Sequence, residues 1–272
     1  MRSPLISAAE LADSLAATTV LDVRYRMGGP GGQEEYAAGH VPGAAYVDLD
    51  SALADPPGSR GRHPLPDVAV FAEAMRQAGV SVERPVVVYD DWAGRAAARC
   101  WWLLRHHGHP DVRVLDGGWA AWTRAGGAVE TGTAAVARGS FTAGPGGLPV
   151  IGADEVLAFA ATHTLVDARA PERYRGDVEP IDPVAGHVPG AVNVPTERNV
   201  REDGSFRDAD DLRRIYGEVG RGVNGRVAAY CGSGVTAAHD VLALAVAGID
   251  AALYPGSWSE WVADSSRPVE TG

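Results

Sequence analysis

The chain has 272 residues and no lysine, so its 24 positions of Lys or Arg are all arginine. A Schiff-base enzyme needs a lysine amine, and a P-loop needs a lysine on the nucleotide phosphates, so both classes are excluded. The formal net charge of −11 argues against a nucleic-acid partner, because phosphate contacts need a basic surface. Arginine remains as the only fixed cation that can bind a small anion.

Membrane and secretion signals are missing from the sequence. No apolar run approaches the ~18 residues of a membrane span, and the first residues lack the basic and apolar segments of a signal peptide. Two cysteines, Cys100 and Cys231, are too few for a disulfide framework, which fits a reducing compartment. We therefore expect a cytoplasmic protein with no membrane partner.

The second half of the chain repeats the first. Gly-His-Val-Pro-Gly-Ala occurs at 39–44 and again at 186–191, and Val-Glu-Thr-Gly occurs at 129–132 and again at 269–272. Ordered matches of this kind predict two homologous domains.

We expect a first domain over residues 1–132, a linker of mainly Ala, Gly, Pro and Ser over 133–149, and a second domain over 150–272. In both domains short β-branched runs are followed by loops and then by helical patterns. This alternation favours an α/β fold, in which each domain has a mainly parallel sheet flanked by helices. The β-branched runs lie at 19–23, 86–89, 164–167 and 227–230.

Features present in both halves are interpreted as structural, because one chain rarely needs two copies of a reaction centre. The Asp-x-Arg segments 22–24 and 167–169 are expected to form partly buried ion pairs at strand ends. His187, in the second Gly-His-Val-Pro-Gly-Ala turn, is expected to bond local backbone. His40, in the first such turn, has the same structural interpretation. It also stays a candidate substrate contact, since ligands often lie between domains.

The two halves differ in one loop. At equivalent points the first half has Asp90 and the second has Cys231-Gly-Ser-Gly-Val-Thr236. The second loop follows a strand pattern and precedes a helical pattern, so its N–H groups and the helix N-terminus can surround the sulfur and favour the thiolate. Cys231 is therefore the candidate nucleophile, whereas Cys100 lies in an apolar helical run and is interpreted as an inert core residue.

Neighbouring residues exclude three chemistries for Cys231. A cysteine phosphatase needs an arginine six residues after the cysteine, where this chain has Ala237. A thioredoxin-like pair needs a second cysteine at the position of Gly234. A metal site needs more ligands nearby than the sequence offers. The remaining interpretation is that the loop has room for one extra sulfur, which Cys231 would hold as a persulfide. We expect neither a metal nor a cofactor.

Over essentially its whole length the chain resembles the tandem-domain rhodanese-type sulfurtransferases. The resemblance is carried by the Asp-x-Arg segments, both Gly-His-Val-Pro-Gly-Ala turns, the segments ending at Trp119 and Trp258, and the single cysteine loop. It implies that the domain over 1–132 is catalytically silent, with Asp90 in place of the nucleophile, and that the domain over 150–272 is catalytic. We expect the protein to be a monomer.

Within this family the cysteine loop sorts the sulfur donors. The sequence of residues 231–236 is similar to the loop of 3-mercaptopyruvate sulfurtransferases, whereas relatives that use thiosulfate carry basic residues there. A loop without a second cation suits a singly charged 2-oxo acid. The loop candidates are Ser233 for catalysis and Gly232, Gly234, Val235 and Thr236 for substrate binding.

Arg173 is the residue that the resemblance assigns to the substrate carboxylate, which an arginine can bind through two nitrogens. When the halves are aligned on Tyr36 and Tyr174, Arg173 falls where the first half has Glu35. The alternative is a solvated surface arginine. Some relatives have a further arginine in the following loop, but residues 177–184 contain none, so the sequence leaves the second substrate contact unidentified.

The expected reaction moves sulfur from 3-mercaptopyruvate to Cys231, which becomes a persulfide as pyruvate leaves. Arg173 holds the carboxylate, and Ser233, with His40 as a further candidate, relays the thiol proton. Cyanide, a thiol or thioredoxin then accepts the sulfur. Thiosulfate as the donor, and a non-catalytic thiol sensor or sulfur-relay protein, stay open as alternatives.

Overall fold

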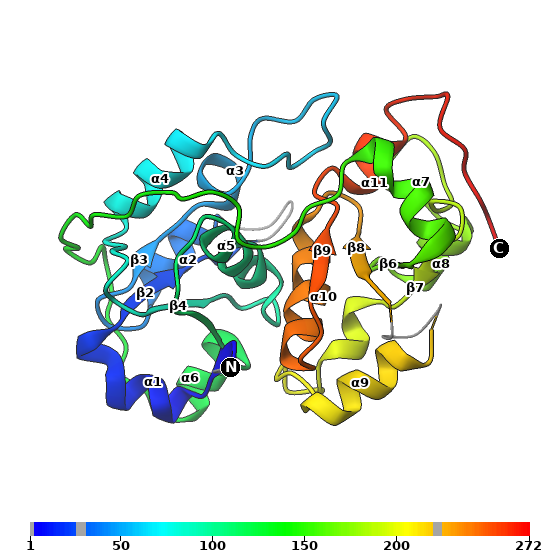
Figure 1. The fold of residues 1–272 in the computed structure, drawn as a ribbon. Helices are drawn as coiled ribbons and strands as arrows, with labels where there is room; N and C mark the ends of the chain where they lie inside the picture. The colour runs from blue at the N-terminus through cyan, green and yellow to red at the C-terminus, as the bar shows by residue number, and fades with distance from the viewer. Residues whose placement is uncertain (1–2, 26–30, 220–224) are drawn as a thin grey trace. The chain divides into compact units, whose positions relative to one another are not determined.

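A computed structural model describes residues 3–25, 31–219 and 225–272 of the chain (Figure 1). The chain divides into two compact units, each of which is described by itself. Unit 1 comprises Met1–Asp55, Pro66–Gly147 and Glu202–Phe206, and unit 2 comprises Pro56–Leu65, Leu148–Arg201 and Arg207–Gly272.

Unit 1 is built on a five-stranded parallel sheet with the strand order β1-β5-β4-β2-β3. The central strands β2 and β4 are fully buried, because both faces of the sheet are covered by helices. The strands are β1 (Leu5–Ile6), β2 (Thr19–Asp22), β3 (Ala45–Tyr46), β4 (Val86–Tyr89) and β5 (Val112–Leu115).

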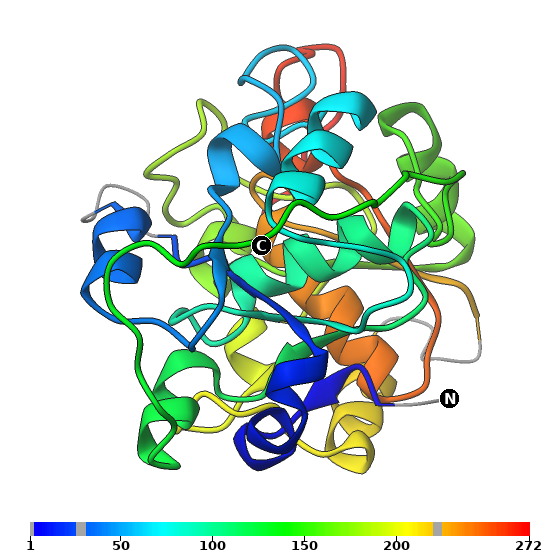
Figure 2. The same cartoon turned by 90° about the vertical axis from the view of Figure 1, so that its left-hand side faces the viewer.

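The helices of unit 1 bury apolar side chains against this sheet. Leu11 and Trp122 pack with Val20 and Val87 in one core cluster, and Figures 1 and 2 show α1 and α6 together at one end of the unit, away from α3 and α4. The helices are α1 (Ala8–Ser14), η1 (Leu15–Ala17), α2 (Gly32–Ala38), α3 (Leu49–Ala52), α4 (Val68–Gln77), α5 (Arg95–His106) and α6 (Gly118–Arg124).

Unit 2 repeats the design with a four-stranded parallel sheet in the order β7-β6-β8-β9. Its strands are β6 (Thr164–Asp167), β7 (Val192–Asn193), β8 (Val227–Tyr230) and β9 (Ala251–Leu253). Its helices are α7 (Ala153–Thr162), α8 (Pro171–Arg175), η2 (Thr196–Asn199), α9 (Ala209–Gly217), α10 (Val235–Val246) and α11 (Ser257–Trp261). Phe159 and Trp258 pack on Leu165 in its core, so α7 and α11 cover one face, while α10 packs on β8 and β9.

The predicted fold class, two α/β units with parallel sheets flanked by helices, is confirmed. The Asp-x-Arg ion pairs also form. Asp22 and Arg24 lie 2.6 Å apart at the end of β2, and Asp167 and Arg169 lie 2.6 Å apart at the end of β6. In both units the arginine also donates to a backbone carbonyl at 2.7 Å, that of Gly39 or Gly186, so the pair fastens the strand end to the Gly-His-Val-Pro-Gly-Ala turn.

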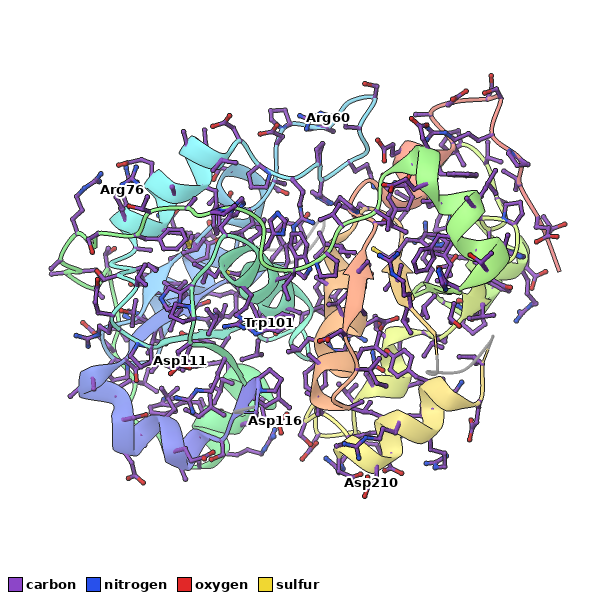
Figure 3. The ribbon with its side chains drawn as sticks, viewed as in Figure 1. Arg60, Arg76, Trp101, Asp111, Asp116 and Asp210 are labelled. Carbon is purple, nitrogen blue, oxygen red and sulfur yellow. The ribbon has the colours of Figure 1, made fainter. Side chains whose placement is uncertain are left out.

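The sequence predicted that the linker over 133–149 separates the two domains, but two short segments belong to the unit on the other side of it. Residues 56–65 group with unit 2, and residues 202–206 group with unit 1. The N–H of Phe206 donates to Asp116, which is labelled in Figure 3, at 2.7 Å. These segments carry no periodic apolar pattern, so only their tertiary contacts assign them to a unit. None of the helices among the described residues is long and apolar enough to cross a membrane.

Candidate active site

Cys231 lies at the point where β8 ends and the loop to α10 begins. Its side chain is only 2 % exposed. The sulfur accepts hydrogen bonds from the N–H groups of Ser233 at 3.4 Å and Gly234 at 3.0 Å. Two backbone donors aimed at one sulfur stabilise a negative charge there. The thiol therefore sits in the cradle of N–H groups that the sequence predicted.

The backbone of this loop requires glycine at position 234. Gly234 has φ of +81°, and a Cβ atom built on it would lie 2.1 Å from the carbonyl oxygen of Pro255. Any other residue would be strained and would push the loop away from the following strand end. The cradle therefore depends on this residue for its shape.

Ser257 fixes the start of the cysteine loop through hydrogen bonds. The N–H of Cys231 donates to Oγ of Ser257 at 3.0 Å, and that hydroxyl donates to the carbonyl of Tyr254 at 2.9 Å. The N–H of Trp258 donates to the carbonyl of Cys231 at 2.9 Å. Ser257 was not predicted as a site residue, although it lies in the segment ending at Trp258 that carries part of the family resemblance.

A histidine from the segment 56–65 lies at the loop. Nδ1 of His63 is 2.8 Å from Oγ of Ser233, the distance of a hydrogen bond. The N–H of the same Ser233 donates to the sulfur of Cys231. A histidine that is hydrogen-bonded to a hydroxyl of the cysteine loop is a candidate pair for moving a proton at this site. The segment passes through the labelled Arg60 in Figure 3.

Two arginines border the loop. A Cβ atom built on Gly232 would lie 2.8 Å from Nη2 of Arg62 and 3.6 Å from Nη1 of Arg173. Arg173 is thus placed next to the cysteine loop, as the resemblance implied. Arg62, which the sequence did not identify, is a second cation beside the loop, whereas residues 177–184 contain no arginine.

Two carboxylates of the loop after α8 hold these arginines. Glu179 accepts from Nε of Arg173 at 3.1 Å and from Nη2 at 2.6 Å. Asp182 accepts from Nη2 of Arg173 at 3.2 Å and is also paired with Nη1 of Arg62. Burial opposes ionisation of Glu179, but the hydrogen bonds from Arg173 and from two backbone N–H groups outweigh it and lower the pKa of Glu179. For Asp182 burial dominates over the attraction of Arg62, and its pKa is raised.

The ion-pair network beside the loop contains equal numbers of arginines and carboxylates. Arg169 joins the same network, because its Nη1 lies 3.4 Å from Glu179. Three arginines therefore face three carboxylates, with Asp167 as the third. With all three carboxylates ionised, the arginines and carboxylates of this network sum to zero, before the charge of a Cys231 thiolate is counted.

His40 lies in unit 1 and is fully buried there. Its Nδ1 is 2.8 Å from the carbonyl of Tyr36, and its ring stacks on that tyrosine at 4.0 Å. His187 of unit 2 makes the same contacts with Tyr174, at 2.8 Å and 3.8 Å. Because the arrangement recurs in both units, it favours the structural interpretation, and we leave His40 out of the candidate active site.

The other loop candidates lie together in unit 2. Val235 and Thr236 form the first turn of α10, directly after the cradle. In the part of the chain that the structure describes, no group of three or more His, Cys, Asp and Glu side chains is arranged to hold a metal ion.

The equivalent loop of unit 1 holds a carboxylate. Oδ1 of Asp90 accepts from the N–H groups of Trp92 at 2.9 Å and Gly94 at 2.8 Å, and Oδ2 accepts from the N–H of Ala97 at 2.9 Å. Complete burial raises the pKa of Asp90. In unit 1 the Asp90 carboxylate therefore occupies the position that the Cys231 thiol has in unit 2.

Fold and site together define a protein of two homologous α/β units. The second unit carries a cysteine loop with two arginines beside it and a His–Ser pair. The model of the rhodanese-like domain matches residues 7–125 and 153–264, one match in each half. The chain therefore belongs to the rhodanese family, and its activity class is that of a sulfurtransferase.

Its relatives carry the names of two sulfurtransferase activities. A Mycobacterium tuberculosis protein named "Putative thiosulfate sulfurtransferase SseB" is 47% identical over 98% of this chain and 97% of its own length. A Pseudomonas aeruginosa protein named "Probable 3-mercaptopyruvate sulfurtransferase" is 43% identical over 98% of both chains. Among solved structures, the 3-mercaptopyruvate sulfurtransferase SseA of Escherichia coli matches with a TM-score of 0.84 and 34% identity, over 95% of this chain and 100% of its own.

Proposed function

We propose that the chain is a 3-mercaptopyruvate sulfurtransferase that works through a persulfide on Cys231. The observation that carries this proposal is the position of the Cys231 sulfur. It accepts two backbone N–H groups at a loop bordered by Arg62 and Arg173. A nucleophilic sulfur, donors for an added sulfur and cations for a carboxylate thus lie in one place.

In the first half-reaction the Cys231 thiolate attacks the sulfur of 3-mercaptopyruvate. An S–S bond forms and the C–S bond breaks. Its electron pair goes to C3, giving the enolate of pyruvate. Protonation at C3 completes pyruvate, and the transferred sulfur stays on Cys231 as a persulfide. The Ser233–His63 pair provides a route for the proton between the substrate thiol and C3.

In the second half-reaction a thiophilic acceptor attacks the outer sulfur of the persulfide. The S–S bond breaks, the acceptor keeps the outer sulfur, and the Cys231 thiolate is restored. Cyanide serves as the acceptor in an assay, and we propose a small thiol or thioredoxin in the cell. Because pyruvate leaves before the acceptor reacts, the kinetics are ping-pong.

The ion-pair network beside the cysteine loop favours 3-mercaptopyruvate as the donor. Arginines and carboxylates are equal in number in this network, so 3-mercaptopyruvate adds one negative charge beside the Cys231 thiolate, whereas thiosulfate adds two. Uncompensated charge in a partly buried site is costly. A second candidate function, transfer of sulfur from thiosulfate, has one observation in its favour: Arg62 supplies the second cation that a dianion needs. A sulfur-relay protein without small-molecule turnover is the third.

Two measurements on the same preparation decide among these functions. Mass spectrometry after incubation with 3-mercaptopyruvate should find one added sulfur in the wild type and in Cys100→Ala, and none in Cys231→Ser. Steady-state rates with cyanide should give a higher kcat/KM for 3-mercaptopyruvate than for thiosulfate. An unmodified wild type would refute the persulfide. Faster turnover of thiosulfate would favour the second function, and turnover of neither donor would favour the relay.

A further inference from the structure

Asp182 joins the two arginines at the cysteine loop. They come from segments far apart in sequence, Arg62 from the segment 56–65 and Arg173 from α8. One oxygen of the carboxylate is paired with Arg62, and the other is 3.2 Å from Nη2 of Arg173. The Asp182 side chain is only 4% exposed, so its charge acts on these cations with little screening by water.

Asp182 leaves one nitrogen of each arginine beside the loop unengaged. Nη2 of Arg173, which Asp182 does engage, lies almost as close to Gly232 as Nη1 does, at 3.7 Å against 3.6 Å from a Cβ atom built there. Asp182 pairs with Nη1 of Arg62, and the nitrogen of that arginine closest to Gly232 is Nη2. Within the described residues, the hydrogen bonds of Arg173 use Nε and Nη2, and Nη1 is the nitrogen nearest to Gly232. One nitrogen of each guanidinium group therefore remains beside the loop, where each can donate to a carboxylate oxygen.

We propose that Asp182 is a specificity-determining residue, which holds Arg62 and Arg173 as a joint receptor for one carboxylate and lowers the charge of the site so that a monoanionic donor is preferred. This inference rests on the proposed sulfurtransferase function. It adds the reason why a site with two arginines selects a singly charged donor.

The charge balance gives the direction of the effect. With Asp182 ionised, the three arginines of the network are matched by three carboxylates. Asp182→Asn keeps the shape of the side chain and removes one negative charge, so the site gains a net positive charge next to Cys231. A dianion gains more from that charge than a monoanion does. Asp182→Asn should therefore shift selectivity toward thiosulfate.

The test compares kcat/KM for thiosulfate and for 3-mercaptopyruvate in three variants. Asp182→Asn should raise the ratio of the two values roughly tenfold or more, mainly through KM, as expected for one unit charge near a partly buried anion. Asp182→Glu keeps the charge and should stay closer to the wild-type ratio. Asp177→Asn is the matched control, because Asp177 lies in the same loop, is 55% exposed and pairs with Arg175; its ratio should not change.

A variant of Arg62 should shift the ratio of the two kcat/KM values in the opposite direction, which gives an independent test. Arg62→Gln removes a cation while Asp182 keeps its charge, so the ratio should fall below that of the wild type. If Asp182→Asn lowers both kcat/KM values equally, or if both substitutions move the ratio in the same direction, the specificity role is refuted and Asp182 is a structural residue only.

A binding measurement separates this inference from the proposed function. Pyruvate and sulfate, a monoanion and a dianion, should each slow the alkylation of Cys231 by iodoacetamide. Asp182→Asn should strengthen protection by sulfate more than protection by pyruvate, and equal changes would overturn the inference. This readout needs no turnover, so it holds even if the wild type proves inactive with 3-mercaptopyruvate and the proposed donor fails.

Discussion

Nδ1 of His63 lies 2.8 Å from Oγ of Ser233, although 170 residues separate the two in the sequence. The backbone N–H of Ser233 donates to the sulfur of Cys231, so one residue contacts the histidine through its side chain and the nucleophile through its backbone. A persulfide-forming reaction has to move a proton from the donor thiol, and this pair is placed to carry it.

We predict that His63→Asn and Ser233→Ala each lower kcat for 3-mercaptopyruvate by roughly 10²-fold, within the range that a positioned acid or base contributes. The double variant should lose little more than the more severe single one, because both residues act in one proton path. Steady-state kinetics with cyanide as the acceptor measures both effects. His163→Asn, a substitution at the end of α7, serves as the control and should keep the wild-type rate. Multiplicative losses in the double variant would show that the two residues act separately.

The sequence was sufficient for the part of the site that is local. Cys231 was identifiable because a strand, a glycine-rich loop and a helix follow one another within a few residues, and Gly234 with its positive φ is part of that pattern. The repeat supplied the second criterion, because Asp90 at the equivalent point isolates the cysteine as the difference between the halves. Arg173 came from the family resemblance and from the same comparison.

The rest of the site could not be predicted, because it is assembled by tertiary contacts. His63 and Arg62 lie in the segment 56–65. By its position in the sequence this segment belongs to the first half of the chain, but in the structure it belongs to unit 2. Nothing in its Gly-, Pro- and Arg-rich composition shows which core it joins. His40 was kept as a candidate because ligands often lie between domains, and its contacts within unit 1, which His187 repeats in unit 2, favour the structural interpretation.

Asp90 gives a prediction about the stability of unit 1. Its carboxylate accepts three backbone N–H groups while fully buried. Asp90→Ala leaves these donors unpaired and should destabilise the protein by roughly 2–4 kcal/mol, whereas Asp90→Asn keeps one acceptor oxygen and should cost less. Urea denaturation measures the loss, with the exposed Asp13→Asn on α1 as the control. Persulfide formation on Cys231 should persist wherever the variants are folded, and an Asp90→Ala protein as stable as the wild type would contradict the account.

The two Asp-x-Arg pairs offer a matched comparison between the units. Arg24 and Arg169 each bind their aspartate at 2.6 Å and a backbone carbonyl at 2.7 Å. Lysine cannot reproduce this forked geometry, so Arg24→Lys and Arg169→Lys should each cost roughly 2 kcal/mol of stability. Arg169 additionally lies 3.4 Å from Glu179, which holds Arg173.

Of the two substitutions, only Arg169→Lys in unit 2 should therefore affect substrate binding. Arg169→Lys should raise KM for 3-mercaptopyruvate severalfold, because Glu179 and with it Arg173 lose a fixed neighbour, while Arg24→Lys should leave KM unchanged. Thermal melts and steady-state kinetics on the same samples separate the two effects. Equal KM values in the two variants would mean that Glu179 positions Arg173 without help from Arg169.

A buried carboxyl on α10 predicts how stability depends on pH. Asp240 is fully buried and accepts from Nδ2 of Asn199 at 2.7 Å, and the Oδ1 of Asn199 accepts from the hydroxyl of Tyr216 at 3.0 Å. Burial raises the pKa of Asp240 well above its ordinary value. The folded state therefore keeps a proton that the unfolded state releases above a pH of about 4. Because the folded state binds more protons, its stability falls as the pH rises from that point.

Asp240→Asn should remove this loss, since a neutral amide retains an acceptor for Asn199 and releases no proton. The variant should melt at a higher temperature than the wild type at pH 8, and the difference should shrink as the pH approaches 4. Melting temperatures between pH 5 and pH 8 measure the trend. Asp210→Asn on α9 is the control (Figure 3), because Asp210 is 93% exposed and pairs only at the surface with Arg213. A variant less stable than the wild type at every pH would show that the Asp240 carboxylate is ionised and paired in the folded protein.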